Sequence, residues 1–418
     1  MIKKNMRASS GFTDTLVLRQ RSGKSWHLAF LASTIFGILA LSALLINIVN
    51  SAMGYVVIDF KINPAVMAVN GIALGEQTTE QWIQLLKDNL STGALNKLEN
   101  VEHLSERSRR EIYSLIETRV LKKEVIESWS LYDSVFHKSE IITEYLHMQE
   151  THPEAQLKLM SWINGDLIMR SQSSEANTAG IRTAVLGSLW TIFFTILFAF
   201  PLGVGAAIYL EEYARDNWIN RLIQTNINNL AGVPSIIYGI LGLAIFVRVL
   251  EPLSSGALFG FTDPTTANGR TILSAGLTLG LLVLPLIIIN SQEAIRAVPQ
   301  SLRKASYGLG ATKWQTIWAH VLPNALPGIL TGTILAISRA IGETAPLVVV
   351  GASTAISFDP TSPFSKFTTL PIQIYQWTSR PQSEWRHLAA ATIIFLLVLL
   401  LCLSAAAILL RNRFEKKY

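Results

Sequence analysis

Long stretches without any charged residue constrain this chain more than any other feature of its sequence. Five of them exceed the roughly 20 apolar residues that cross the hydrocarbon core of a bilayer. They lie between Lys24 and Asp59, Arg182 and Glu211, Arg221 and Arg248, Arg270 and Glu293, and Arg386 and Arg411. A sixth stretch, 324–350, is apolar except for Arg339 and Glu343. Because backbone groups in lipid must pair within their own segment, each stretch is expected to form a helix.

The fold class predicted from these stretches is an all-α polytopic membrane protein. Half of the 418 residues are hydrophobic and 15% are charged, against about a quarter charged in soluble domains, which argues against a soluble enzyme. The first stretch lacks a small-residue cleavage site, so we expect an anchor rather than a removed signal peptide. The transmembrane helices are predicted near 28–49, 183–210, 225–247, 271–292, 324–350 and 388–410.

The distribution of basic residues predicts the orientation of the helices. An even number of spans places both basic tails, 1–27 and 411–418, on one side of the membrane. Together with the loops on that side they hold 16 Lys and Arg residues, against 5 in the two short loops on the other side. The positive-inside rule then puts both tails in the cytoplasm and leaves the long segment 51–182 outside.

The segment 51–182 is too polar for the bilayer and too long to lack structure of its own. The β-branched run 55–62 predicts a strand. Helices are predicted after three capping boxes, which are Thr78-x-x-Gln81, Ser108-x-x-Glu111 and Thr151-x-x-Glu154. We therefore expect a small, mainly helical α/β insert between the first and second spans. Its role stays open between docking a partner and packing over the outer mouth of the membrane part, 183–410.

The loop 293–323, between the fourth and fifth spans, predicts two short helices joined by a turn. Pro299 suits a helix start, glycines at 308 and 310 break that helix, and Thr312-x-x-Gln315 is a capping box for the second helix. Small residues at 305, 306, 310 and 311 would let another protein approach closely. From the residues alone, a docking site and an ordinary interfacial helix pair are equally supported.

The sequence around this loop resembles a known family. The spacing Ala305-Ser306-x3-Gly310-x11-Leu322-Pro323 is similar to the EAA loop of ABC-importer permeases, which inserts a coupling helix into a groove of the ATPase. Four further runs resemble the PstA-type permeases of phosphate-specific ABC importers, namely G-V-P-S-I-I-Y-G (232–239), G-A-T-K-W-Q-T-I (310–317), L-P-N-A-L-P-G-I-L-T-G (322–332) and R-A-I-G-E-T-A-P-L (339–347). The resemblance covers residues 176–418.

The resemblance implies that the loop couples the permease to an ATPase. Lys304 stands where the family usually has a glutamate, so any charge contact of that glutamate is replaced or reversed here. His320 takes a place that is usually aliphatic. The residues of the implied coupling surface are Lys304, Ala305, Ser306, Gly310, Ala311, Thr312, Lys313 and Trp314.

Two charged residues inside the fifth stretch are candidates for the substrate path. Arg339 and Glu343 are four residues apart, which places them on one face of a continuous helix. An arginine at the centre of a span costs about 2.5–3.5 kcal/mol on insertion scales, so such residues usually pair and face a bundle interior or a water-filled path. The arginine fork suits phosphate oxygens, and the carboxylate would keep the anion releasable. The alternative is a structural ion pair that pins two helices.

Other intramembrane features predict packing, and several catalytic motifs are missing from the sequence. The pairs Gly276-x3-Gly280 and Gly328-x3-Gly332 would let helices approach closely. No G-x4-G-K-[ST] phosphate loop, metal-ligand pair or nucleophile motif occurs in the 418 residues. We therefore expect a transport subunit that is not itself an enzyme and binds no cofactor, while a partner ATPase uses ATP and magnesium.

The family resemblance also implies an assembly and a substrate. The partners would be a second, PstC-type permease, a PstB-type ATPase dimer and a periplasmic PstS-type phosphate-binding protein, in a bacterial inner membrane. Inorganic phosphate would move from the periplasm to the cytoplasm by ATPase-coupled alternating access. Two alternatives stay open, namely an ABC permease for another oxyanion and a membrane sensor or scaffold with 51–182 as its ligand-binding ectodomain.

Overall fold

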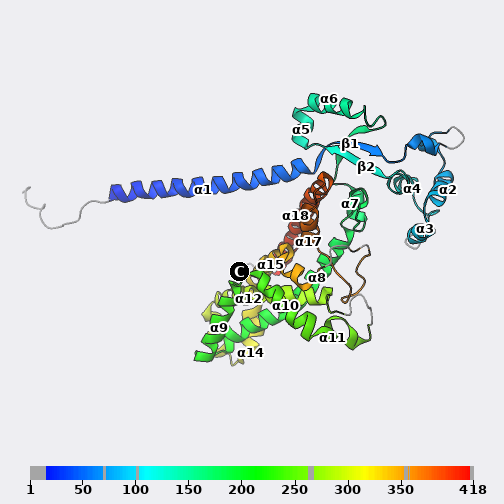
Figure 1. The fold of residues 1–418 in the computed structure, drawn as a ribbon. Coiled ribbons are helices and arrows are strands. Elements are labelled where there is room, and N and C mark those ends of the chain that lie inside the picture. The colour runs from blue at the N-terminus through cyan, green and yellow to red at the C-terminus, as the bar shows by residue number, and fades with distance from the viewer. Residues whose placement is uncertain are drawn as a thin grey trace, which may run out of the picture.

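The chain forms a helical membrane bundle that carries a small insert with one β-sheet (Figure 1). The computed structural model describes residues 16–68, 72–99, 103–261, 268–352, 356 and 358–414. Within these ranges, five helices are long and apolar enough to cross a membrane, and a bent pair of helices would make a sixth span. The five helices are α1 (Leu16–Ser51), α8 (Arg182–Ile208), α12 (Ile272–Arg296), α15 (Leu322–Gly342) and α18 (Ser383–Phe414).

The third predicted span is not the continuous helix that 225–247 suggested. It consists of α9 (Trp218–Ala231) and α10 (Ser235–Gly242), and a π-helical segment continues α10 as far as Val249. The two halves are bent by 107° at the intervening break. Pro234 is the residue before α10, and proline lacks the N–H that a continuous helix needs and disfavours helical backbone in the residue before it. The apolar run is therefore a candidate span as predicted, but the prediction of one continuous helix is wrong.

Helix α12 lies at the centre of the bundle and packs against α8 and α15. Four glycines stand at these contacts, where an added Cβ would come within 2.3–2.8 Å of a side-chain atom on the neighbouring helix. Side chains larger than glycine would push the helices apart at these positions. The close pairs are Gly276 with Phe194, Gly280 with Phe198, Gly328 with Ala294 and Gly332 with Asn290.

The insert is built on a three-stranded antiparallel sheet with the strand order β2-β1-β3. Its strands are β1 (Met53–Phe60), β2 (Lys123–Ser128) and β3 (Gln156–Ser161). The predicted strand at 55–62 is confirmed by β1. The predicted helix after Thr151 is wrong, because Gln156–Ser161 pairs with β1 instead. A run with apolar residues at 157 and 160 fits either a helix or a strand, and the backbone partner offered by β1 decides between them.

Two of the three capping boxes form as predicted. Thr78 caps α2 (Thr79–Asn89) and Ser108 caps α4 (Arg109–Leu115), each with a reciprocal hydrogen bond from the third helical residue. These helices and the adjoining π-helical turn enclose a core of their own around Leu86, Ile112 and Ile116. The other described helices of the insert are α3 (Thr92–Glu99), α5 (Leu131–Phe136), α6 (Lys138–Met148) and α7 (Gly165–Met169).

The sheet shares a hydrophobic core with the membrane helices. Val56 and Val125 of the sheet belong to the same buried cluster as Trp377 of α17 (Leu370–Thr378) and Leu388 of α18. His387 lies at this junction, with Nδ1 next to the carbonyl oxygen of the last residue of α1 and Nε2 2.8 Å from a hydroxyl of β2. The insert is therefore packed onto the bundle rather than tethered to it.

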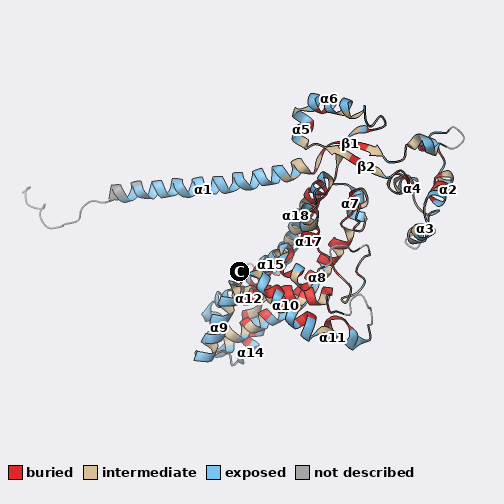
Figure 2. Cartoon of the chain, viewed as in Figure 1, coloured by how far each residue is buried: buried red, intermediate tan, exposed pale blue. Residues whose placement is uncertain are grey.

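Helix α1 projects from the rest of the chain. Its membrane-length segment has no buried residue, whereas α12 is largely buried (Figure 2). Such a helix is stable only in a solvent as apolar as its own surface, which is a lipid bilayer or the face of another membrane helix. Short helices complete the described bundle, namely α11 (Glu251–Ser254), α13 (Gln300–Gly308), α14 (Lys313–Thr316) and α16 (Ala345–Val350).

Candidate functional site

The loop at 293–323 forms the two short helices that the sequence predicts. Pro299 precedes α13, and the Thr312 capping box opens α14 with Gln315 as its reciprocal partner. Gly308 completes α13 rather than breaking it, and the turn itself is made at Gly310, whose φ is +83°. That left-handed conformation is readily adopted by glycine and disfavoured for most other residues.

Buried polar contacts hold the two helices of this loop together and attach them to the bundle. The hydroxyls of Ser306 and Thr316 are 2.9 Å apart and buried. Arg303 donates to Glu212 over 2.9 Å, in an ion pair whose carboxylate side chain is only 7% exposed. Ser306 therefore lies inside the loop, and the expectation that a partner approaches it directly is corrected. Its small hydroxyl is needed for the internal contact with Thr316.

The outward face of the loop is apolar and basic. Leu309, at the tip, is 91% exposed, and Trp314 and Trp318 stack on each other with ring centroids 5.6 Å apart while both remain more than half exposed. Lys313 lies 5.0 Å over the ring of Tyr213, and Lys304 is exposed. Ala305 and Thr312 are exposed as well, and Ala311 is partly buried. The residues that sequence analysis assigned to coupling thus lie on one projecting loop.

Sequence analysis did not single out Leu309, although it is the most exposed large hydrophobic residue among those described. The signal that could have found it is its position between the two glycines at 308 and 310, because an apolar residue in a tight turn cannot reach a core.

The second helix of the loop is not separate from the fifth span. A π-helical turn at Ile317–Val321 joins α14 to α15, so Lys313–Gly342 is one uninterrupted helix of 30 residues. Lys313 and Arg339 are therefore about 40 Å apart along the axis of one helix, at a rise of 1.5 Å per residue.

The fifth predicted span, 324–350, is broken where the charged pair lies. Helix α15 ends at Gly342, Glu343 has an extended backbone (φ −76°, ψ 126°), and α16 begins at Ala345 with Pro346 in its first turn. Arg339 and Glu343 are thus not on one face of a continuous helix, as the spacing suggested. Their side chains still meet, because Nε of Arg339 is 3.4 Å from Oε1 of Glu343.

The two members of this pair differ in exposure. The arginine side chain is 44% exposed and the carboxylate 18%. Arg339 is in the last turn of α15, where the partial negative charge of the helix terminus favours a cation. The site thus presents a fixed positive charge outward, with a half-shielded carboxylate behind it.

A small cavity of about 10 Å³ is lined by Ala340 and Ile341 of α15, and neither member of the charged pair contributes to its wall. Three hydroxyl residues contribute to its wall, namely Ser188, Thr191 and Thr369, and the Thr369 hydroxyl is buried without a hydrogen-bond partner. A space of this size holds about one water molecule. Among the residues that the structure describes, no group of His, Cys, Asp and Glu is placed to hold a metal ion.

Comparison with known proteins identifies a family for the bundle. Residues 199–417 match the family described as binding-protein-dependent transport system inner membrane component. The chain is 34% identical over 219 residues to the probable ABC transporter permease protein YqgI of Bacillus subtilis, across 52% of this chain and 68% of the relative.

Several relatives have names that state a substrate. The chain is 35% identical over 244 residues to the phosphate transport system permease protein PstA of Yersinia pestis, across 58% of this chain and 75% of the relative. It is 34% identical over 201 residues to the phosphate transport system permease protein PstC of Pasteurella multocida, across 46% of this chain and 62% of the relative.

Among solved structures, an inward-facing form of the MetNI methionine ABC transporter matches 56% of this chain and 96% of its own chain, with 18% identity and a TM-score of 0.42. The family assignment rests on the sequence match, which covers all the described helices from the last third of α8 onward. Permeases of this family bind no cofactor, and a separate chain hydrolyses ATP. The chain belongs to the binding-protein-dependent transport system inner membrane components, as a multi-pass permease subunit of an ABC importer.

Proposed function

We propose that this chain is the PstA-type permease subunit of an importer for inorganic phosphate. Relatives named as phosphate permeases and the run R-A-I-G-E-T-A-P-L at 339–347 support this substrate. The chain would form one half of the pore with a PstC-type permease. A PstB-type ATPase dimer would supply the energy, and a PstS-type binding protein would deliver phosphate from the periplasm.

The observation that carries the proposal is the charged pair at the break between α15 and α16. An exposed arginine in a membrane span is costly unless it faces water or another polar group, and Arg339 is 44% exposed in this chain. Its planar fork can hold two phosphate oxygens at once, which a lysine cannot. Glu343, 3.4 Å away, competes with the anion for the arginine, so binding is weak enough for release.

The loop would transmit ATPase closure to this pair. The tip at Leu309 and the stacked Trp314 and Trp318 form an exposed apolar surface of the kind that fills a groove on a partner. Because Lys313–Gly342 is a single helix, a push on the loop would reach Arg339 along one element. In this proposal both tails are cytoplasmic and the insert 51–182 is periplasmic.

Phosphate uptake by the complete transporter in proteoliposomes tests the path role of Arg339. We expect Arg339→Ala to lower uptake by at least roughly ten-fold, since each charge-assisted hydrogen bond contributes about 1.5–3 kcal/mol. Arg339→Lys keeps the charge without the fork and should recover part of the activity. Arg248→Ala, which removes an exposed arginine at the end of the α10 segment, is the control.

Assembly of each variant with the partner chains is measured in the same preparations. Normal uptake by Arg339→Ala would contradict a path role. Loss of assembly together with loss of uptake would instead show that the pair pins the bundle.

A further inference from the structure

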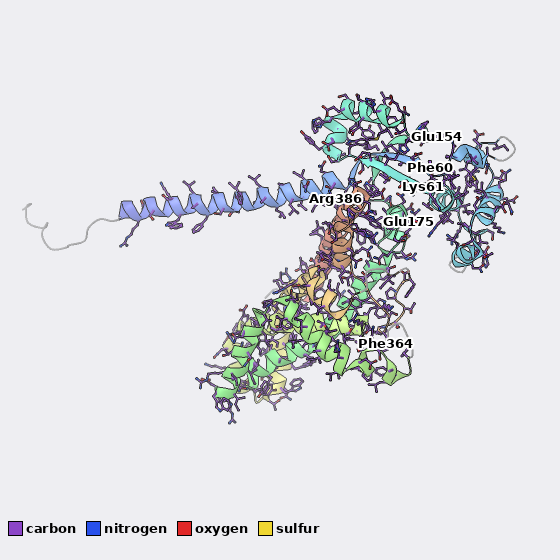
Figure 3. All side chains as sticks on the ribbon, in the orientation of Figure 1. Phe60, Lys61, Glu154, Glu175, Phe364 and Arg386 are labelled. Atoms are coloured by element: carbon purple, nitrogen blue, oxygen red, sulfur yellow. The ribbon has the colours of Figure 1, made fainter. Side chains whose placement is uncertain are left out.

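A row of buried polar side chains follows one face of α17, which contacts both α8 and α18. Thr369 is the residue before this helix, and Gln373 and Trp377 follow at intervals of four residues, so the three side chains share a face. Their exposed fractions are 3%, 0% and 0%. The loop that carries Phe364 (Figure 3) leads into α17, and two of its carbonyl oxygens accept hydrogen bonds from the start of α12.

The polar atoms of this face have no hydrogen-bond partner among the residues that the structure describes. They are the hydroxyl of Thr369, both polar atoms of the Gln373 amide and the indole Nε1 of Trp377. A buried polar group without a partner lowers stability, and an apolar side chain of similar shape avoids that cost. In folded proteins, buried groups of this kind that lack a protein partner are typically satisfied by ordered water.

The cavity at Thr369 offers space and partners for such a molecule. It lies where α8, α12, α15, α16 and the start of α17 meet, and its volume of about 10 Å³ is at the lower limit for one water molecule. In its wall, the Ser188 hydroxyl accepts from the backbone N–H of Leu370 over 3.0 Å, and the Thr191 hydroxyl donates to the carbonyl oxygen of Gly187 over 2.7 Å. Each of these hydroxyl oxygens keeps a lone pair that a water molecule can bond, while the Thr369 hydroxyl can donate to that water.

The chemistry of the wall favours a neutral ligand. None of the side chains that line the cavity is charged, so an ion placed there would lose its hydration without gaining a counter-charge. A water molecule needs two to four polar partners, and the three hydroxyls of the wall supply them.

We propose that ordered water binds along this face, with Thr369, Gln373 and Trp377 as its partners on α17 and with the hydroxyls of α8 opposite Thr369. The water would join α17 to α8 where no direct side-chain bond does so at these three positions. The proposal goes beyond phosphate import and depends neither on phosphate nor on a partner chain.

Radiolytic footprinting of the full chain in lipid nanodiscs tests the proposal. X-ray pulses convert ordered water into hydroxyl radicals, which oxidise the side chains that touch it, including buried ones. Trp82 is the internal reference, because it is also buried, at 3% exposure, but its Nε1 donates to the carbonyl oxygen of Leu74 over 2.8 Å. Exposure alone predicts that Trp82 is oxidised at least as fast as Trp377, whereas bound water predicts faster oxidation of Trp377.

A matched pair of variants assigns the oxidation to this face. Gln373→Leu removes the amide between the other two partners, so we expect oxidation of Trp377 to fall while that of Trp82 stays constant. Thr333→Val is the control, because the buried Thr333 hydroxyl already donates to the carbonyl oxygen of Ile329 over 2.8 Å, and it should leave Trp377 unchanged. Oxidation of Trp377 no faster than that of Trp82 in the unaltered chain would overturn the proposal, as would undiminished oxidation in Gln373→Leu.

The melting temperature of Thr369→Val gives a second measurement that is independent of radiolysis. Valine replaces the hydroxyl at nearly constant volume. If the hydroxyl bonds water, its removal leaves that water with one partner fewer, and we expect the melting temperature in nanodiscs to fall. A dry, unpaired hydroxyl predicts the opposite shift, because its removal relieves the cost of burying it, so a rise would contradict the proposal.

Discussion

At the scale of single residues, the charged pair combines two requirements that conflict. In the proposed substrate path Arg339 would attract an anion, and the same attraction would trap the anion there. Glu343 lies 3.4 Å from the guanidinium and is more shielded than the arginine. A carboxylate at this distance offsets most of the arginine charge when the site is empty and yields when an anion arrives.

This arrangement predicts the effect of removing the carboxylate. In Glu343→Gln the arginine is uncompensated, so phosphate should bind more tightly and leave more slowly. We expect the KM of uptake to fall by roughly ten-fold, which corresponds to about 1.4 kcal/mol, and the maximal rate to fall with it. Glu343→Asp keeps the charge and is the control, and an unchanged KM and rate in Glu343→Gln would refute the idea.

At the scale of elements, the turn at Gly310 sets the shape of the coupling loop. An added Cβ there would meet nothing within 4 Å in this chain, so the glycine is required by its φ of +83° and not by crowding. Valine is strongly disfavoured in that region, whereas asparagine tolerates it. The two substitutions therefore separate the backbone requirement from the space needed by a partner.

We expect Gly310→Asn to fold with the loop intact and to lose ATPase association, because its side chain projects from the proposed docking surface. Gly310→Val should also destabilise the loop itself, by about 1–2 kcal/mol. Co-purification of the ATPase measures the first effect, and hydrogen exchange of the loop amides measures the second. Normal ATPase association in Gly310→Asn would mean that no partner approaches this turn.

At the scale of the whole molecule, the insert and the bundle are one packed body. Trp162 stacks on His387 with ring planes only 6° apart, and the sheet shares its core with α17 and α18. A motion of α18 would therefore reach the insert through direct contacts.

Cysteine labelling tests the proposed orientation of this body in the membrane. The chain has one cysteine, Cys402, so Cys402→Ser provides a cysteine-free background. We expect a membrane-impermeant maleimide to label Glu150→Cys, on the insert, from the periplasmic side. Gln315→Cys, on the coupling loop, should react only after the inner membrane is permeabilised, and the opposite pattern would reverse the topology.

Sequence alone determined the features that depend on local chemistry. The charge-free runs located the membrane helices, because a run of about twenty apolar residues is too hydrophobic to stay in water as a loop. The capping boxes at Thr78, Ser108 and Thr312 began helices as predicted, since their hydrogen bonds close within four residues. The spacing of Arg339 and Glu343 predicted that their side chains meet, although the helix that this prediction assumed ends at Gly342.

The tertiary structure decided what depends on partners distant in the chain. Gln156–Ser161 is a strand because its backbone pairs with β1. The Ser306 side chain is buried because its hydroxyl bonds to that of Thr316. The sequence permitted the helix breaks at Pro234 and before Pro346. Pro201 and Pro285, however, lie inside α8 and α12 without ending those helices. A proline bends a membrane helix or ends it according to whether neighbouring helices satisfy the freed carbonyl groups, and that choice is made by packing.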